Sequence, residues 1–403
     1  MQDRRTGCMP IRRSHEIGHA LTIDLVAPGG QPAVRTTCFQ AWREELPSGA
    51  VRTSTALPPR SWSAPEVPPP AGGEADRACR LLVEFAAGLG ASAALRYSRL
   101  VSRRHVTDAE EMWQSREVNV FALTGRIGLA NGRFISLGWS GFGDGFDRMI
   151  EGPMRRRVAW IARSAAAAAP MEAGAGPAVL DPQSTALVVH EAVGHFSEAA
   201  VDASVDLRHR LGCRLAADGF DVFDDPSLPG AARYQVDDEG TEAIGPTRVL
   251  ADGVIIQQLH SRRSAAAAAS LPTANARAAQ ITLPPIPRLS NLVMPAGTSS
   301  QDSLLEMMGS GLMVHHLSHG FSRGIEMEAR IVLAERVEGG RLTGRFVSGG
   351  RVTERVDVLT RARSRGDCSE LNPNALCGKH GQILYDVGTI APALLLSSLR
   401  ISA

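Results

Sequence analysis

The chain has 403 residues, of which 44% are hydrophobic, and its 43 basic and 42 acidic residues leave a net charge of +1. This length predicts two or three domains with ample apolar side chains for their cores, and the balanced charge argues against nucleic acid or an anionic membrane surface as a partner. Because no apolar run reaches the length of a membrane span or forms a signal peptide, and six cysteines are too few for a disulfide scaffold in a chain this long, we expect a cytoplasmic protein with reduced thiols.

The N-terminal segment, residues 1–73, combines a strand with a linker. Residues 21–25 alternate between apolar and polar side chains with the period of a strand, and Pro28-Gly29-Gly30 follows as a turn. Six prolines then fall within residues 57–73, which is typical of a linker or an extended loop. We therefore predict that residues 1–73 are an N-terminal extension, which the proline-rich linker divides from the rest of the chain.

A short histidine motif lies directly before this strand. His15 and His19 flank Glu16 with the histidine spacing of the common zincin motif. That motif needs a helix, which turns both imidazoles toward one ion, whereas the residues after His19 have the period of a strand. We therefore interpret His15-Glu16-x-x-His19 as a chance match rather than as a metal site.

Residues 74–172 predict an α+β domain. Helices are expected over residues 74–96 and 153–169, and strands over 95–101, 118–123 and 133–138. Asn131-Gly132, between the last two strands, indicates a hairpin. The three arginines at 155–157 are interpreted as a solvated face of the second helix.

Residues 173–403 predict a β-rich domain that contains one important helix. Strands are expected over 177–180, 253–256, 329–334 and 344–347, and the alanines at 265–269 form a loop or a short helix. Asp181 and Ser184 are candidates for the N-cap of the helix that follows the first strand, because their side-chain oxygens can accept hydrogen bonds from its first amides.

This helix carries the sequence His190-Glu191-x-x-x-His195. Two imidazoles can hold a zinc ion, and the carboxylate can accept a proton from a water molecule that the metal has acidified. The histidines are five residues apart, about 140° around a regular α-helix, so a regular helix would direct them away from each other. We expect a π-bulge, which brings residues i and i+5 to one face, or a last turn that opens, and Gly194 makes either distortion easier. On the motif alone, an ordinary helix with two surface histidines is the alternative.

A catalytic zinc ion usually has three protein ligands and one open position. Cys377 is the best candidate for the third ligand, because Gly378 and Gly381 let the backbone approach an ion closely and a thiolate binds zinc strongly. A small buried hydrophobic residue is the alternative interpretation of a lone cysteine.

Together, the sequences His-Glu-Ala-Val-Gly-His at 190–195 and Cys-Gly-Lys-x-Gly-Gln at 377–382 resemble the TldD/PmbA family of metallopeptidases. Further segments follow in the family's order and look like its acidic turn and its paired downstream segments, at residues 237–240, 272–277 and 285–291. The resemblance covers residues 74–400. It is strongest at the two metal motifs.

The resemblance implies a fold and a set of site residues. The fold would be an α+β N-terminal domain over 74–172, followed by a β-rich, barrel-like C-terminal domain over 173–403 that carries the metal-site helix. His190, His195 and Cys377 would bind a zinc ion, and Glu191 would be the general base.

It also implies a partner and a substrate class. Members of the family occur as two related subunits, and the TldD-like subunit carries the metal motif, so this chain resembles the catalytic one. It would form a heterodimer with a PmbA-like homologue, or a homodimer. Known activities of the family are the degradation of unfolded peptides, the trimming of leader peptides from modified peptides, and reactions on small amino-acid or peptide conjugates in natural-product pathways.

Three further residues are candidates for substrate binding. Arg277 and Arg288 could hold a substrate carboxylate through paired hydrogen bonds, although plain structural arginines are the alternative. His316 belongs to the cluster His315-His316-x-x-His319, which we interpret either as substrate-binding or proton-shuttling, or as chance histidines at a strand end.

Three functions compete at this stage. The leading hypothesis is a zinc-dependent peptidase that binds an extended peptide as an added strand. A biosynthetic enzyme that cleaves or eliminates from a small amino-acid conjugate is the second, because the N-terminal half is short for the family and residues 1–73 have no evident counterpart in it. The third is a non-catalytic subunit with a structural metal. Glu191 argues against it, because a structural site has no need of a base.

Overall fold

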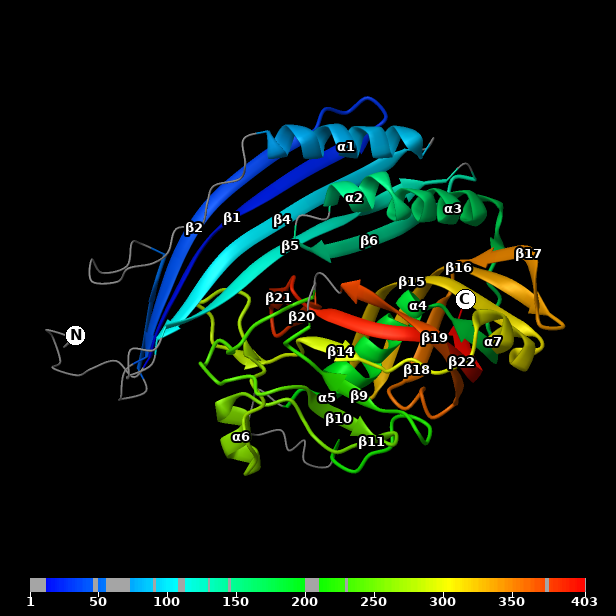
Figure 1. The fold of residues 1–403 in the computed structure, drawn as a ribbon. Coiled ribbons are helices and arrows are strands. Elements are labelled where there is room, and N and C mark those ends of the chain that lie inside the picture. Colours follow the sequence, from blue (N-terminus) through cyan, green and yellow to red (C-terminus); the bar gives the residue numbers. More distant parts are fainter. Residues whose placement is uncertain are drawn as a thin grey trace, which may run out of the picture.

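The computed structural model of the chain describes residues 12–45, 50–55, 73–89, 92–107, 113–129, 131–143, 146–199, 210–228, 231–373 and 377–402. Two main β-sheets and the helices packed on them make up the fold, which confirms the predicted α+β class. A long N-terminal sheet with three helices on its outer face arches over a more compact β-rich part (Figure 1). Among the described helices, none is long and apolar enough to cross a membrane.

The N-terminal sheet has six antiparallel strands in the order β3-β2-β1-β4-β5-β6. They are β1 (Arg12–Ala27), β2 (Ala33–Glu45), β3 (Val51–Ser54), β4 (Ala93–Thr107), β5 (Trp113–Gly128) and β6 (Phe134–Phe142). The helices on the outer face are α1 (Glu74–Gly88), α2 (Phe146–Glu151) and α3 (Pro153–Ala167). The alternation of apolar and polar residues along β1 directs Leu21 and Ile23 to the face that α1 covers, where they are buried in one cluster with Leu82 and Phe85.

The predicted boundary at residue 73 does not separate two units. Strand β1 pairs with β4 along its length, from Arg13 opposite Thr107 to Ala27 opposite Ala93. The predicted extension therefore contributes three strands to the sheet of the following domain. Alternation along a segment specifies a strand but not its partner, which explains the difference. Residues 57–72 of the predicted linker lie outside the described residues.

The predicted hairpin and first helix of the N-terminal part are present, although the helix ends at a different residue from the one predicted. The hairpin at Asn131-Gly132 joins β5 to β6, and Gly132 has a positive φ of 79°. The first helix ends at Gly88 rather than at residue 96, and β4 begins at Ala93.

The second sheet has twelve strands, with the path β11-β10-β9-β14-β22-β8-β15-β16-β17-β7 and two strands, β18 and β19, beside it. They are β7 (Ala169–Pro170), β8 (Gly174–Leu180), β9 (Val222–Asp224), β10 (Thr247–Ala251), β11 (Val254–Ile255), β14 (Asn291–Val293), β15 (Gly311–Arg323), β16 (Glu326–Glu338), β17 (Arg341–Ser348), β18 (Arg351–Arg355), β19 (Ala362–Pro373) and β22 (Gly388–Ser402). Strands β22, β8, β15, β16 and β18 close a circuit of pairings. The others extend outward, so a barrel-like shape for the whole domain is not confirmed.

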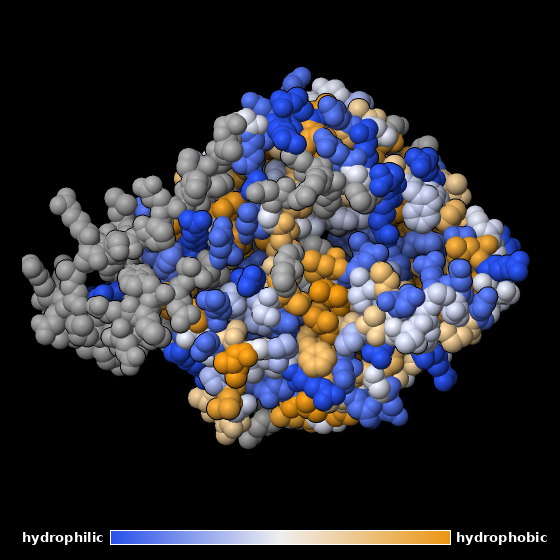
Figure 2. All heavy atoms as spheres, viewed as in Figure 1, coloured by the Kyte–Doolittle hydropathy of each residue, from blue (hydrophilic) through white to orange (hydrophobic). Residues whose placement is uncertain are grey.

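Short elements complete the second part of the chain. They are α6 (Arg262–Ala268), α7 (Gln301–Met308), the two-stranded pair β12 (Ala276–Arg277) and β13 (Ile286–Pro287), and the hairpin of β20 (Cys377–Lys379) and β21 (Gln382–Leu384). On the face shown in Figure 2, hydrophilic side chains cover most of the N-terminal layer, and hydrophobic side chains gather near the middle of the face.

The motif helix begins directly after the central strand β8. It comprises α4 (Pro182–Val189), a π-helical turn η1 (His190–Gly194) and a last short turn α5 (His195–Ser197). Asp181 is its N-cap, and its carboxylate accepts a hydrogen bond from the amide of Ser184 at 2.7 Å. The guanidinium of Arg157 donates to the same carboxylate and to the carbonyl oxygen of His315. Arg157 therefore ties α3 to the start of the motif helix and is not part of a solvated face.

Replacement of Asp181 by alanine should destabilise this junction. The helix loses its N-cap, worth about 1 kcal/mol, and the half-buried Arg157 loses its carboxylate. We expect the free energy of unfolding to fall by about 1–2 kcal/mol, measured as a lower midpoint of thermal unfolding. Asp218→Ala is the control, because that carboxylate is exposed and its ion pair with Arg214 lies at the surface. Equal midpoints for the two variants would contradict the assignment.

Candidate metal centre

The π-helical turn brings the two histidines of the motif together, as the five-residue spacing predicted. The amide of His195 donates its hydrogen bond to the carbonyl oxygen of His190, five residues earlier. The two imidazole rings lie at right angles, with centroids 4.7 Å apart. His190 is buried and His195 is partly buried. The distortion of the helix therefore places both rings on one side.

Gly194 has a different role from the predicted one. Its φ of −57° belongs to the ordinary helical region, which any residue adopts, so backbone freedom is not what requires glycine. A Cβ atom at this position would lie 2.8 Å from side-chain carbons of both Leu289 and Leu292. The missing side chain therefore lets the turn pack closely against the segment that enters β14.

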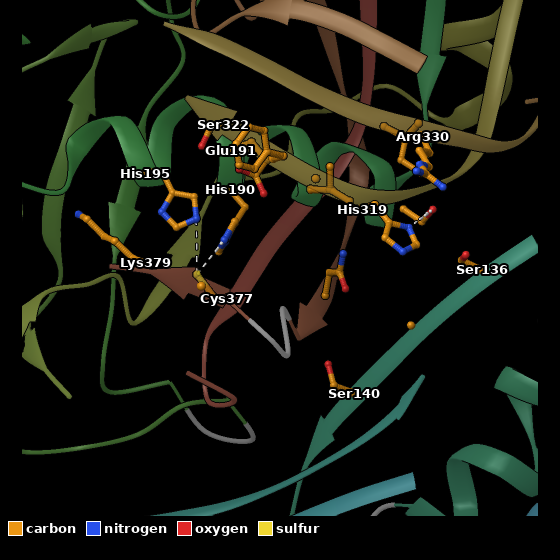
Figure 3. A pocket seen from close by; sticks show the side chains of 18 of the residues that line it. Ser136, Ser140, His190, Glu191, His195, His319, Ser322, Arg330, Cys377 and Lys379 are labelled. Carbon is orange, nitrogen blue, oxygen red and sulfur yellow. Dashed lines mark hydrogen bonds between the residues drawn. The ribbon is translucent and has the colours of Figure 1, made fainter. Parts of the chain in front are cut away.

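Cys377 lies opposite the two imidazoles on the hairpin β20–β21 (Figure 3). Its Sγ atom is 3.3 Å from His190 Nε2 and 3.5 Å from His195 Nε2. A tetrahedral zinc site with Zn–S of about 2.3 Å and Zn–N of about 2.0–2.1 Å places sulfur and nitrogen ligands about 3.6 Å apart. All three ligand atoms lie within 4.8 Å of one another. The donor set and its spacing therefore fit a zinc ion.

The electrostatics of the cluster favour the ligand form of the thiol. Burial by itself would raise the pKa of Cys377, but the imidazoles of His190 and His195 outweigh it and hold that pKa well below the usual range. A thiolate, rather than a thiol, is the species that binds a metal. The pKa of His195 is raised in turn, because the carboxylate of Glu198 and the sulfur of Cys377 outweigh the lowering by burial.

Glu198 supports the cluster and was not singled out from the sequence. It is fully buried, and its Oε2 atom accepts hydrogen bonds from His195 Nδ1 at 3.0 Å and from Lys379 Nζ at 2.7 Å. Its Oε1 atom accepts from the amide of Leu289 at 3.0 Å. Burial would raise the pKa of this carboxyl, but Lys379 and His195 hold it well below the usual range. A carboxylate on the outer nitrogen of a metal-binding histidine fixes the orientation of the ring.

Glu198 and Lys379 both lie in or next to the motifs identified in the sequence, but the sequence does not show that they are in contact. Glu198 follows His195 by three residues, and Lys379 belongs to the Cys-Gly-Lys motif. Only the fold brings the two segments together, across 181 residues of chain.

Arg277 and Arg288 match the structural alternative rather than a substrate-binding role. Both side chains are completely buried. Arg277 forms an ion pair with Asp386 at 2.7 Å, and Arg288 donates to the carbonyl oxygen of Cys377 at 2.6 Å and to its sulfur at 3.1 Å. Their donors are directed into the protein, because the loops around β12 and β13 are packed under the metal-site hairpin.

His316 is buried, which bears on the substrate-binding and proton-shuttling roles considered for it. It is buried on β15, and its ring stacks on the indole of Trp139 from β6 at 5.1 Å with an angle of 5°. Burial lowers the pKa of His316 to about 3, so the ring is neutral near pH 7 and unsuited to proton shuttling. His316 still lines the cavity described below.

The rival sequence His15-Glu16-x-x-His19 lies on the strand β1. Residues four apart on a strand are separated by about 13 Å along the backbone, so this segment lacks the helical spacing on which the zincin motif depends. Glu16 instead forms a buried ion pair with Arg104 at 2.9 Å.

A cavity of about 1210 Å³ runs from the metal cluster into the space between the two sheets. Residues of β5, β6, β15, β16 and the motif helix line it. Glu191 lies on its wall next to His190, and a Cβ at Gly320 of β15 would come within 2.7 Å of the Glu191 carboxylate. Gly320 therefore lets β15 pass close to that carboxylate.

Comparison with known proteins identifies the fold and its relatives. Residues 173–403 match the family model described as the PmbA/TldA metallopeptidase C-terminal domain. A metalloprotease of Synechocystis sp. is 30% identical over 73% of this chain and 64% of its own length. A zinc metalloprotease TldD homolog of Saccharolobus solfataricus is 29% identical over 35% of this chain and 32% of its own length.

The crystal structure of TldE from Thermococcus kodakarensis has a similar fold, with a TM-score of 0.74 and 14% identity over 97% of this chain and 96% of that one. Coverage this complete indicates that strands β1, β2 and β3 belong to the shared fold. The match to the Synechocystis protein covers 64% of that relative, and a match to a Methanocaldococcus jannaschii metalloprotease covers 48%, so the chain spans less than two thirds of these curated relatives.

Replacement of Cys377 by alanine should remove most of the bound metal. The variant keeps only two of the three ligands. Loss of a group that is hydrogen-bonded to a ligand weakens metal binding about 10–100-fold, and we expect the loss of a ligand itself to weaken it further. Elemental analysis after dialysis measures the change. Cys368→Ala, at an exposed cysteine, should keep full occupancy. Full occupancy in Cys377→Ala would exclude this cysteine as a ligand.

Replacement of Glu198 by glutamine tests the support of His195. The amide keeps the shape of the side chain but removes the charge that faces His195 and Lys379, and we expect metal binding about 10–100-fold weaker. A competition titration with a chelator gives the dissociation constant, with exposed Glu306→Gln as the control. The same dissociation constant in both variants would show that Glu198 serves stability alone.

Proposed function

The chain belongs to the TldD/PmbA family of metallopeptidases, and we propose that it is a zinc-dependent hydrolase of amide bonds in peptides or peptide-like conjugates. One observation supports the proposal: the ligand atoms of His190, His195 and Cys377 lie close enough together to hold a metal ion, and Glu191 lies beside them on the wall of a large cavity.

Zinc suits this set of ligands. Imidazole and thiolate are the ligands of many zinc sites, and three protein ligands with a fourth position open to a cavity are typical of catalytic ones. A relative carries the name zinc metalloprotease. A bound zinc ion supplies Lewis acidity, which acidifies a water molecule and polarises a carbonyl group.

We assign the proton transfers to Glu191. Its carboxylate lines the cavity, and no described residue forms a hydrogen bond to it. It is therefore available to accept a proton from the attacking water molecule and to pass that proton to the leaving amine. Gly320 leaves room for this carboxylate, because a Cβ atom there would lie 2.7 Å from Glu191 Oε1.

The size of the cavity favours a peptide as the substrate. At about 1210 Å³ it exceeds the roughly 300–1,000 Å³ of typical small-molecule sites. The hypothesis of a biosynthetic enzyme for small conjugates relied on a short N-terminal half, and strands β1, β2 and β3 complete that half. The hypothesis of a structural metal is disfavoured, because the cavity reaches the ligands and a structural site is closed.

We also propose a partner and a location. The chain carries the metal motif and would be the catalytic member of a pair, either with a PmbA-like homologue or with a second copy. The fold similarity to TldE is consistent with such a pair. The cytoplasm is the proposed location, because the five described cysteines are free and a reducing compartment preserves a thiolate ligand.

Replacement of Glu191 by glutamine should separate metal binding from turnover. The variant should keep the metal of the wild type, since His190, His195 and Cys377 are unchanged, and peptide hydrolysis should fall about 10²–10⁴-fold with the loss of the base. The measurements are elemental analysis and cleavage of a peptide mixture followed by mass spectrometry. Exposed Glu338→Gln is the control. Normal turnover in Glu191→Gln would refute the mechanism.

A further inference from the structure

The cavity has two ends with different chemistry. The metal cluster and Glu191 occupy one end. The other end, which we call the remote end, is lined by Arg126, Ser136, Ser318, His319 and Arg330. Figure 3 shows Ser136, His319 and Arg330 across the cavity from the cluster.

Two pairs of neighbouring strands build the remote end. Arg126 of β5 lies opposite Ser136 of β6, and Arg330 of β16 lies opposite Ser318 of β15. Residues directly opposite each other on antiparallel strands project from the same face of a sheet. Each of the two sheets therefore contributes one arginine and one hydroxyl to the lining of the same cavity, and the guanidinium of Arg126 lies over the ring of Phe134, 4.7 Å from its centroid.

The backbone is distorted where β15 reaches this end. The pairing of β15 with β16 shifts register between Ser318 and Phe321, and His319 has a φ of +53°, a conformation that is uncommon outside glycine. The His319 ring lies 3.0 Å from the hydroxyl of Ser318. Burial, followed by the charges of Arg330 and Arg126, lowers the pKa of His319. Backbone strain of this kind concentrates at functional sites.

Among the described residues, no acidic side chain lines the remote end. Among the described residues that line the cavity, the acidic ones are Glu191 and Glu198, which belong to the metal end. Within the described part of the chain, no carboxylate forms an ion pair with Arg126 or Arg330. A guanidinium that faces a cavity without a counter-charge is suited to bind a carboxylate through paired hydrogen bonds.

We infer that Arg126 and Arg330 bind a carboxylate of the substrate at the remote end, while the amide bond to be cleaved lies at the metal cluster. The inference rests on the proposed function and narrows its substrate class to peptides with a negative charge. That charge has two sources in a peptide, the free C-terminus and an acidic side chain. The shared chemistry is the carboxylate, and the experiment separates the sources.

Isothermal titration calorimetry on the metal-loaded Glu191→Gln protein measures binding without turnover. The probes are N-acetylated alanine peptides of four to eight residues. One pair of series compares a free C-terminus with a C-terminal amide. A second pair keeps the C-terminal amide and compares a single Glu with a single Gln, placed at each position in turn. Either the free C-terminus or the Glu series should bind about tenfold more tightly than its neutral counterpart, because a charge-assisted hydrogen bond is gained.

The preference should depend on the two arginines. Adding Arg126→Gln or Arg330→Gln should bring charged and neutral peptides to nearly equal affinity. Arg330→Lys, which keeps the charge, should retain part of the preference. Arg336→Gln is the matched control, because Arg336 lies on the same strand, β16, and pairs with Glu172 away from the cavity. Equal binding of neutral peptides to every variant shows that the cavity is intact.

Three outcomes would overturn the inference: equal affinity for charged and neutral peptides, no binding of any of them, or a preference that survives both substitutions together. Its failure is distinct from that of the proposed function. If the wild type cleaves charged and neutral peptides alike, the function stands and the carboxylate site is refuted. If charged peptides bind preferentially but the wild type cleaves none of them, the site stands and the hydrolase is refuted.

Discussion

The hydrogen bond from the amide of His195 to the carbonyl oxygen of His190 determines the geometry of the candidate metal centre. It replaces the usual i→i+4 bond by an i→i+5 bond, and the wider turn places the second imidazole beside the first. Such turns are rare because they interrupt regular helical bonding. Here close packing stabilises the turn. The side chains of Leu289 and Leu292 lie so close to Gly194 that no larger residue would fit there. The position of the imidazoles thus depends on contacts with Leu289 and Leu292, 95 and 98 residues after Gly194 in the chain.

The same packing buries several charged side chains. Each of them lies next to a group of opposite charge. Glu198 lies between His195 and Lys379, and Arg288 lies beside both Glu198 and the sulfur of Cys377. A buried charge without a partner costs several kcal/mol, so removal of one member would leave the others unsatisfied. This network connects the motif helix, the loop before β14 and the β20–β21 hairpin. It holds Cys377 at ligand distance although 182 residues separate this cysteine from His195.

Local features of the sequence predicted local structure well. The five-residue histidine spacing predicted the π-turn, Asp181 was correctly identified as an N-cap candidate, and Asn131-Gly132 predicted its hairpin. The errors concern contacts between distant segments. Alternation in β1 did not specify β4 as its partner, and the charge of Arg288 suggested a substrate contact although its partners lie in segments that only the fold brings near. Glu198 was missed for the same reason, because its importance depends on Lys379 and not on its neighbours in sequence.

The two parts of the chain contribute different residues to the cavity. The candidate metal cluster, Glu191 and their supporting network all come from residues after 180. The N-terminal sheet supplies the opposite wall, and Trp139 on β6 stacks on His316 of β15 where the two sheets meet. Arg126 reaches the remote end from this wall, whereas Arg330 reaches it from the other. Substitutions on the inner face of the N-terminal sheet can therefore reshape this wall of the cavity without displacing His190, His195 or Cys377. Under the proposed function, the long curved strands of that sheet would select the peptide and the C-terminal domain would cleave it.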